Sequence, residues 1–150
     1  MRAVVQRVTE AAVSVDGVRV AVIGPGLLVL CGVAPTDGDT DTDWLARKIA
    51  SLRVFDDVAG VMNLSISEAG GDILAVSQFT LHASTRRGAR PSYSAAAPPE
   101  QARPLYEAFV RKLEGYHGRR VATGVFGAHM HVSLINDGPV TLWLDTTARE

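Results

Sequence analysis

The sequence contains a single cysteine, Cys31, so no disulfide bond can form within the chain. Aromatic residues make up only 6% of it. No stretch reaches the roughly 18 consecutive apolar residues that a membrane-spanning helix needs. No long apolar segment follows the basic residues near position 1, so we expect no secretory signal. A cytoplasmic location without membrane contact is therefore the expectation.

A large charge of either sign is missing as well, because 15 basic residues stand against 16 acidic ones and leave a formal net charge of −1. A protein that holds nucleic acid mainly through phosphates is usually strongly basic. Any contact with RNA would therefore be local. The length of 150 residues, with 47% hydrophobic and 21% charged residues, predicts one globular domain over residues 1–150.

The first third of the chain is predicted to form strands. Residues 3–8 alternate with a period of two, which is typical of a strand with one buried face. Asp16-Gly17 separates two short valine-rich runs and predicts a tight hairpin turn. The continuous apolar run Leu27–Val33 predicts a strand buried on both faces, where Cys31 would be an inert thiol.

Two main helices are expected. Thr40 followed by Asp43 resembles a capping box at the start of the first helix. The second helix should bury Leu105, Phe109 and Leu113. Pro104 lacks an N–H group and clashes with the preceding turn, so we expect it to kink this helix or to delay its start.

Further strands are expected at residues 73–79, 121–126, 130–135 and 140–144. Together these elements predict an α/β protein. It would be a strand-rich, three-layer domain with mixed or antiparallel sheets and two main helices.

Two polar segments stand out as candidates for chemistry. The first, Ser77-Gln78-Phe79-Thr80-Leu81, ends a buried strand. Its polar groups would either bond to nearby backbone or form a cluster of donors aimed at a carbonyl oxygen. The second, Asn136-Asp137-Gly138-Pro139-Val140-Thr141, is either a plain hairpin turn or a functional loop.

These two segments resemble the two signature motifs of the D-aminoacyl-tRNA deacylase family. The similarity extends to four further segments. They are Met1-Arg2-Ala3-Val4-Val5-Gln6-Arg7-Val8, Met62-Asn63-Leu64, Arg90-Pro91-Ser92-Tyr93 and Phe126-Gly127-Ala128-His129-Met130. The resemblance covers nearly the whole chain in order, except at Pro104 and after Asp145. It implies an editing hydrolase that removes D-amino acids, and glycine mischarged on tRNA(Ala), from tRNA without a cofactor.

The resemblance also implies a homodimer whose active sites lie at the interface. Ser77, Gln78, Phe79 and Thr80 of one chain would form the catalytic pocket for the aminoacyl group and the terminal adenosine. Gly138 and Pro139, joined by a cis peptide bond, would reach into that pocket from the partner chain and exclude L-amino acids. Arg7, Met130 and Asn136 would brace this motif or shape the adenosine site.

Other candidates keep two interpretations each. Arg86, Arg87 and Arg90 form either a solvated loop or a contact with tRNA phosphates. His82 is either structural or, if the strand continues past Thr80, a base on the same face. His129 and His131 would share a strand face, but no neighbouring Cys, Asp or Glu completes a metal site, so no metal is expected.

The sequence contains no evident Ser-His-Asp set for hydrolysing the ester. The nucleophile would be either Thr80 or a water activated by the 2′-hydroxyl of the substrate ribose, and we favour the water. Two alternative functions remain open from the residues. One is a non-catalytic module that binds RNA ends, and the other is a general small-molecule esterase.

Overall fold

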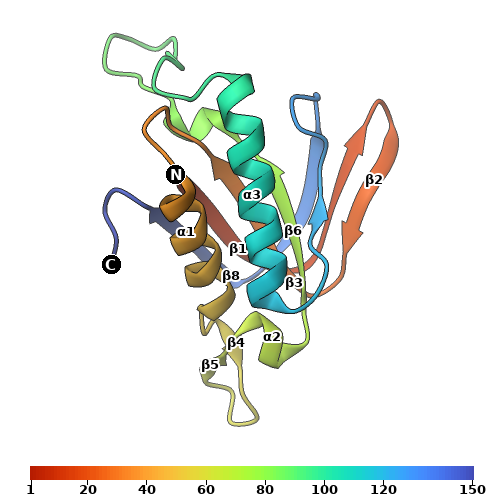
Figure 1. Ribbon diagram of the computed structural model, residues 1–150. Coiled ribbons are helices and arrows are strands. Elements are labelled where there is room, and N and C mark those ends of the chain that lie inside the picture. The colour runs from red at the N-terminus through yellow and green to blue at the C-terminus, as the bar shows by residue number, and fades with distance from the viewer.

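The computed structural model describes all 150 residues (Figure 1). Its long elements are two helices and a set of strands that form one large sheet. Short elements lie between them. The strands are β1 (Arg2–Val15), β2 (Val18–Ile23), β3 (Gly26–Gly32), β4 (Phe55–Asp56), β5 (Met62–Leu64), β6 (Asp72–Ser77), β7 (Ala122–Thr123) and β8 (His131–Asp145). The helices are α1 (Asp39–Ser51), α2 (Ile66–Ala69), the 3-10 helix η1 (Phe79–His82) and α3 (Pro99–His117).

The central strand of the six-stranded sheet is β1. One edge of β1 pairs with β8 in antiparallel fashion from Arg2 to Ser14. The other edge pairs first with β3 and then, beyond Val8, with β2. Strand β6 is parallel to β3, and β7 is parallel to β6, so the sheet is mixed.

Alternate side chains of β3 point into two separate cores. Leu27 and Val29 pack in the larger core, beneath α1 and α3. Leu28 packs in a smaller core with residues from the C-terminal half of β1 and the N-terminal half of β8. The structure therefore has three layers (Figure 1). They are the helices, the central strands, and the parts of β1 and β8 that pack against the smaller core. The expected α/β class, with a mixed sheet and two main helices, is confirmed.

Local predictions in the first third are confirmed as well. Asp16 and Gly17 have φ values of 50° and 76° and join β1 to β2 as a tight hairpin. Strand β3 is buried along nearly its whole length. No helix of the structure has both the length and the apolar character needed to cross a membrane.

The first helix begins differently from the prediction, at Asp39 with Gly38 as the preceding cap. The Asp41 carboxylate accepts a hydrogen bond from the Gly38 N–H at 2.9 Å, so the capping box based on Thr40 and Asp43 was wrong. Asp43 instead accepts a hydrogen bond from the Tyr116 hydroxyl at 2.8 Å, which connects α1 to α3.

The second helix is continuous from Pro99 to His117, so Pro104 does not delay its start. Pro99 occupies the first position, where a missing N–H costs nothing, and Pro104 is an exposed residue that removes one internal hydrogen bond. The buried stripe contains Tyr106, Phe109 and Leu113, whereas Leu105 is only partly buried.

The prediction of three separate strands after residue 120 was wrong. Strand β7 has only two residues, and residues 131–135 and 140–144 belong to the single strand β8. Because β1 is 14 residues long, it pairs with both halves. Asn136 lies opposite Val8 and Thr141 opposite Gln6, so residues 137–140 bulge out between them. The segment is therefore a bulge within a strand rather than a hairpin turn.

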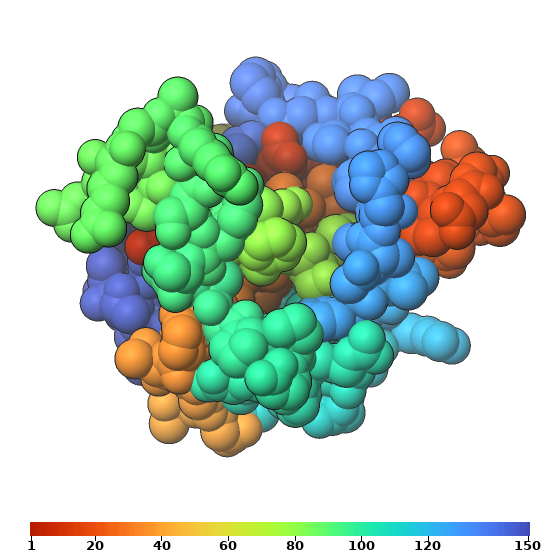
Figure 2. All heavy atoms as spheres, turned by 90° about the horizontal axis from the view of Figure 1, so that it is seen from above, coloured from red at the N-terminus to blue at the C-terminus, as the bar shows by residue number.

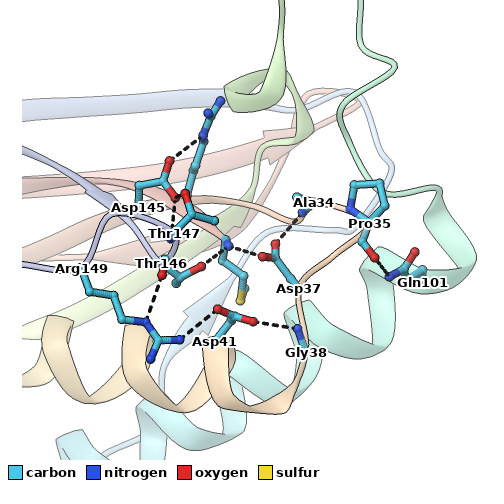
Figure 3. A network of polar contacts seen from close by, with 12 residues as sticks. Ala34, Pro35, Asp37, Gly38, Asp41, Gln101, Asp145, Thr146, Thr147 and Arg149 are labelled. Atoms are coloured by element: carbon cyan, nitrogen blue, oxygen red, sulfur yellow. Dashed lines mark hydrogen bonds and ion pairs between the residues drawn. The ribbon is translucent and has the colours of Figure 1, made fainter.

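A polar network joins the two ends of the chain to α1 (Figure 3). The terminal ammonium of Met1 lies 2.5 Å from a carboxylate oxygen of Asp37 and donates to the Thr146 hydroxyl at 2.5 Å. Both charged groups are almost fully buried, with side-chain exposures of 0% and 2%. A buried cation of this kind is tolerated only with a partner.

We predict that Asp37→Asn lowers the free energy of unfolding by about 3 kcal/mol, because it leaves the buried ammonium without a counter-charge. Urea denaturation of the purified variant measures this loss. Asp39→Asn is the matched control, since Asp39 pairs with Lys112 on the surface and is 85% exposed. The control should lose less than about 1 kcal/mol. Equal stability of the two variants would contradict the assignment.

Candidate functional site

A pocket of about 610 Å³ opens at the carboxyl ends of the parallel strands β3 and β6. Ligands of open α/β sheets bind at this edge, where loops leave the strands. Figure 2 shows the hollow from above, with the end of β6 between the 84–98 loop, α3 and the segment before β8. The wall residues are mostly apolar. They include Cys31, Gly32, Tyr93, Pro98, Pro99, Ala102, Tyr106, Phe126 and Met130.

The first predicted motif forms one side of this pocket. Strand β6 ends at Ser77, and the Gln78 N–H donates to the Cys31 carbonyl at 2.7 Å. The chain then turns into η1, so the predicted strand to Phe79 is two residues too long. Ser77, Gln78 and Phe79 line the pocket. As the first residues of a 3-10 helix, Phe79 and Thr80 carry N–H groups that the helix itself leaves unpaired.

Thr80, the next residue, is half-buried and is not among the residues that line the cavity. Its hydroxyl accepts a hydrogen bond from the side-chain amide of Gln78. An amide N–H is a donor and cannot take the hydroxyl proton. Phe79 is 55% exposed and meets Tyr93 edge to face at 5.1 Å, which forms an apolar rim on the pocket.

The second predicted motif lies on the bulge of β8 and does not line the pocket of its own chain. The Gly138–Pro139 peptide bond is cis, and both residues are exposed. Gly138 has a φ of 121°, a conformation that side chains rarely adopt. A Cβ atom there would lie 2.9 Å from the Val140 side chain and 3.0 Å from the Arg7 guanidinium.

The side chains of Arg7 and Asn136 fix this bulge by hydrogen bonds to backbone carbonyls. The Arg7 guanidinium donates to the Asp137 carbonyl at 3.2 Å and to the Val54 carbonyl at 2.7 Å. The Asn136 amide donates to the carbonyls of Arg7 at 2.9 Å and Val140 at 3.0 Å. Buried polar groups with several partners hold one geometry firmly. The bulge therefore presents Gly138 and Pro139 on a rigid support.

Comparison with known proteins places these features in a family. The sequence profile described as D-Tyr-tRNA(Tyr) deacylase matches residues 4–145. The chain belongs to the D-Tyr-tRNA(Tyr) deacylase family. A relative from Chromobacterium violaceum, named D-aminoacyl-tRNA deacylase, is 58% identical over 146 residues, 97% of each chain. A protein of the same name from Bacteroides thetaiotaomicron is 55% identical over 150 residues and the full length of both.

Two solved structures resemble the fold. The structure titled c-Myc DNA Unwinding Element Binding Protein has a TM-score of 0.90 at 41% identity, over 97% of this chain and 98% of that one. A probable eukaryotic D-amino acid tRNA deacylase has a TM-score of 0.79 over 95% of this chain and 97% of that one. Its identity is only 17%, so this second likeness concerns the fold alone.

The remaining predicted residues of this deacylase-family chain lie around the pocket. Met130 lines it, in the segment that enters β8. Arg86, Arg87 and Arg90 are exposed in the loop after η1. The same loop contributes Tyr93 to the wall, so the three arginines lie on the segment that forms one rim.

Two further side chains with titratable groups, Cys31 and His82, are buried in this deacylase fold. Cys31 is buried, as predicted, and burial raises the pKa of its thiol to about 12. His82 lies in η1 and not on a continuing strand, and its ring is buried. Burial lowers the pKa of His82, which keeps the ring neutral near pH 7. No hydrogen bond joins its ring to the Thr80 hydroxyl, and its buried Nε2 has no hydrogen-bond partner, so the structure does not place it as a base for that hydroxyl.

The rings of His129 and His131 lie close together, with centroids 5.2 Å apart, but β8 begins only at His131, so the prediction that the two share a strand face was wrong. Only His129 of the two lines the pocket. No group of three or more His, Cys, Asp or Glu side chains is arranged to hold a metal ion.

Sequence reasoning assigned no role to several residues that form the pocket of this family member. Tyr93 and Phe126 line the pocket. Both belong to segments that resemble the family, but nothing in the sequence was a chemical reason to assign either side chain a role. Tyr106 comes from the buried stripe of α3, and its hydroxyl donates to the Ala75 carbonyl at 3.0 Å. Gly32 matters because a Cβ there would approach the Gln78 carbonyl to 2.7 Å. Only the folded arrangement shows that these residues share a wall.

Proposed function

We propose that this protein hydrolyses the ester bond of D-aminoacyl-tRNA and releases the free D-amino acid and tRNA. The observation that supports this most is the position of Ser77, Gln78 and Phe79 on the wall of the pocket at the carboxyl ends of β3 and β6. Full-length relatives at 52–58% identity carry the name D-aminoacyl-tRNA deacylase. A volume of about 610 Å³ lies within the usual range for small-ligand sites, and the terminal adenosine with its aminoacyl group would occupy it.

The unpaired N–H groups at the start of η1 supply the electrostatic part of this reaction. In the proposal they donate to the carbonyl oxygen of the ester as it becomes negatively charged. Such preorganised donors are typically worth a few kcal/mol each. The apolar walls exclude bulk water, which strengthens these hydrogen bonds.

The nucleophile in this proposal is a water held by the 2′-hydroxyl of the terminal ribose. Thr80 is the weaker candidate, because its hydroxyl accepts from Gln78 and no base contacts it. The water oxygen forms a bond to the ester carbon, and the bond from that carbon to the ribose 3′-oxygen breaks. One water proton passes to the 3′-oxygen, and the carboxyl group keeps the hydroxyl.

Chirality is read in a homodimer, where the bulge of one chain enters the pocket of its partner. Gly138 and Pro139 are exposed and lie outside their own pocket, which leaves them free for that contact. A backbone wall blocks the direction of an L side chain and leaves the opposite direction open to any D side chain. Glycine has no side chain to block, so glycyl-tRNA, including glycine mischarged on tRNA(Ala), is cleaved as well.

The basic loop adds affinity for the rest of the tRNA. Arg86, Arg87 and Arg90 are exposed on the segment that also supplies Tyr93 to the pocket. In the proposal they contact phosphates of the acceptor stem. Phosphate contacts of this kind position the RNA without reading its sequence. A phosphate contact through only these three loop arginines is local, as expected for a protein with a net charge of −1.

The proposed function is tested with two esters of the same D-amino acid, one on tRNA and one on a simple alcohol. We expect cleavage of the tRNA ester alone, because only it carries the adenosine that fills the pocket. Release of the amino acid measures both reactions. Equal cleavage of both esters would indicate a general esterase. Binding of tRNA without cleavage would indicate a non-catalytic module.

The identity of the nucleophile is tested by combining Thr80→Ala with a substrate that ends in 2′-deoxyadenosine. We expect Thr80→Ala to keep most of its kcat on the normal substrate. The deoxy substrate should react at least about 100-fold more slowly, since it lacks the group that activates water. Thermal melting shows whether the variant is folded. A folded but inactive variant, with normal cleavage of the deoxy substrate, would make Thr80 the nucleophile.

The role of the bulge is tested by Gly138→Ala. The new Cβ is crowded by Val140 and Arg7, and the positive φ costs about 1–3 kcal/mol, so the wall shifts. We expect the ratio of kcat/KM for D- over L-aminoacyl-tRNA to fall about tenfold, which corresponds to about 1.4 kcal/mol.

Gly17→Ala is the matched control for this variant. It carries a similar backbone penalty at a φ of 76°, but it lies in the β1–β2 hairpin with open space around it. Its D/L ratio should stay at the parent value. Exclusion of L side chains by the Gly138–Pro139 bulge of a partner chain also requires a dimer. Light scattering of the parent should therefore give twice the chain mass of 16.0 kDa. An unchanged ratio in Gly138→Ala, or a parent that is only monomeric at micromolar concentration, argues against the model.

A further inference from the structure

Three arginine side chains in this protein lie over aromatic rings, and one of them has no acidic partner. Two of the three are each held by a carboxylate as well as a ring, at 3.0 Å and 3.1 Å. These two pairs are Arg2 over Trp143 with Asp145, and Arg149 over Trp44 with Asp41. The third is Arg103, whose guanidinium lies 4.9 Å from the centre of the Phe126 ring. Arg103 forms no ion pair or hydrogen bond within the chain.

The position of Arg103 connects it to the pocket. Pro99, Ala102 and Tyr106 of α3 all line the cavity, and Arg103 lies between them on an exposed part of the helix. Its partner Phe126 also lines the cavity and packs against Tyr106, with ring centres 5.9 Å apart. The guanidinium therefore lies at the rim of the pocket, and the ring beneath it is part of the wall.

The acidic neighbours on the helix leave this guanidinium free. Glu100 and Glu107 lie three and four residues away, a spacing at which helical side chains can meet. Neither carboxylate comes within ion-pair distance of Arg103. The ring restricts the side chain, and its planar set of N–H donors stays open to solvent. Such a guanidinium matches the geometry of a phosphate group, to which it can donate two parallel hydrogen bonds.

We propose that Arg103 binds a backbone phosphate of the substrate strand where that strand leaves the pocket. This inference rests on the proposed function, in which the terminal adenosine fills the cavity. A nucleotide in that position is joined through a phosphate to the preceding one, so the strand crosses the rim with a negative charge. Arg103 is a binding residue that adds affinity without touching the ester. It lies on α3, outside the basic loop after η1.

The test compares Arg103→Ala with the parent on two substrates, D-aminoacyl-tRNA and the same D-amino acid esterified to adenosine. The adenosine ester fills the pocket but carries no phosphate. We expect kcat/KM on the tRNA substrate to fall about tenfold, mainly through KM, as loss of one charge-assisted hydrogen bond implies. On the adenosine ester the variant should match the parent. Arg103→Lys should recover part of the loss, because lysine keeps the charge but not the planar donors.

Arg111→Ala is the matched control, since Arg111 is exposed two turns further along α3, outside the pocket wall, and carries the same charge. It should behave like the parent on both substrates. Binding of uncharged tRNA adds a readout that does not depend on hydrolysis. Arg103→Ala should raise its Kd about tenfold and reduce the dependence of log Kd on log salt by about one phosphate contact.

Several results would overturn the proposal. Equal losses on both substrates would mean that Arg103 acts only by positioning Phe126. An equal loss in Arg111→Ala would mean that general surface charge is responsible. An unchanged Kd for uncharged tRNA would exclude the phosphate contact even if the parent cleaved neither ester. A parent without activity whose Kd still depends on Arg103 would disprove the proposed function but keep this contact.

Discussion

The pairing of β1 with β8 is the constraint on which the rest of the structure depends. Strand β1 accepts β8 along one edge over nearly its whole length, and β3 and then β2 along the other. This arrangement fixes where β8 must bulge, because Asn136 and Thr141 are held opposite Val8 and Gln6. The residues between them have no partner on β1. They project Gly138 and Pro139 from the sheet.

The same pairing explains why Arg7 supports the bulge. Arg7 lies on β1 between Gln6 and Val8, directly opposite the residues that loop out. Its guanidinium donates to the Asp137 carbonyl and to the Val54 carbonyl. An arginine with several acceptors around it is costly to move, since each lost partner leaves a buried polar group unsatisfied. The bulge at residues 137–140, which has no partner on β1, is therefore held in one conformation.

The pocket has a different origin, in the parallel pair β3 and β6. Their carboxyl ends lie together, and the chain leaves them by the turn into η1 and by the loop that leads to α1. The start of α3 and the segment before β8 complete the walls. Charge is local, since the protein is nearly neutral overall, and the exposed Arg86, Arg87, Arg90 and Arg103 lie on the two segments that also supply Tyr93 and Ala102 to the pocket wall. In the proposed function, the apolar walls supply shape complementarity to the terminal adenosine and the exposed guanidinium groups supply charge for the phosphates.

The sequence by itself determined those features that depend on neighbouring residues. Asp16 and Gly17 form the predicted hairpin because a tight turn needs positive φ values at both positions. The apolar run after Gly26 forms a buried strand because it has no polar face to expose. The motif around Ser77 lies on the pocket wall, at the end of a strand that its apolar residues made predictable.

Tertiary structure alone decided the rest, because it depends on partners distant in the chain. Residues 136–141 have the composition of a turn, and only the length of β1 keeps both sides in one strand. Pro104 stays within α3 because packing of Tyr106, Phe109 and Leu113 outweighs one lost hydrogen bond. Tyr106 and Phe126 meet at a shared wall although 20 positions separate them in the sequence. Local patterns cannot encode such contacts, since burial of a side chain is a property of the whole fold.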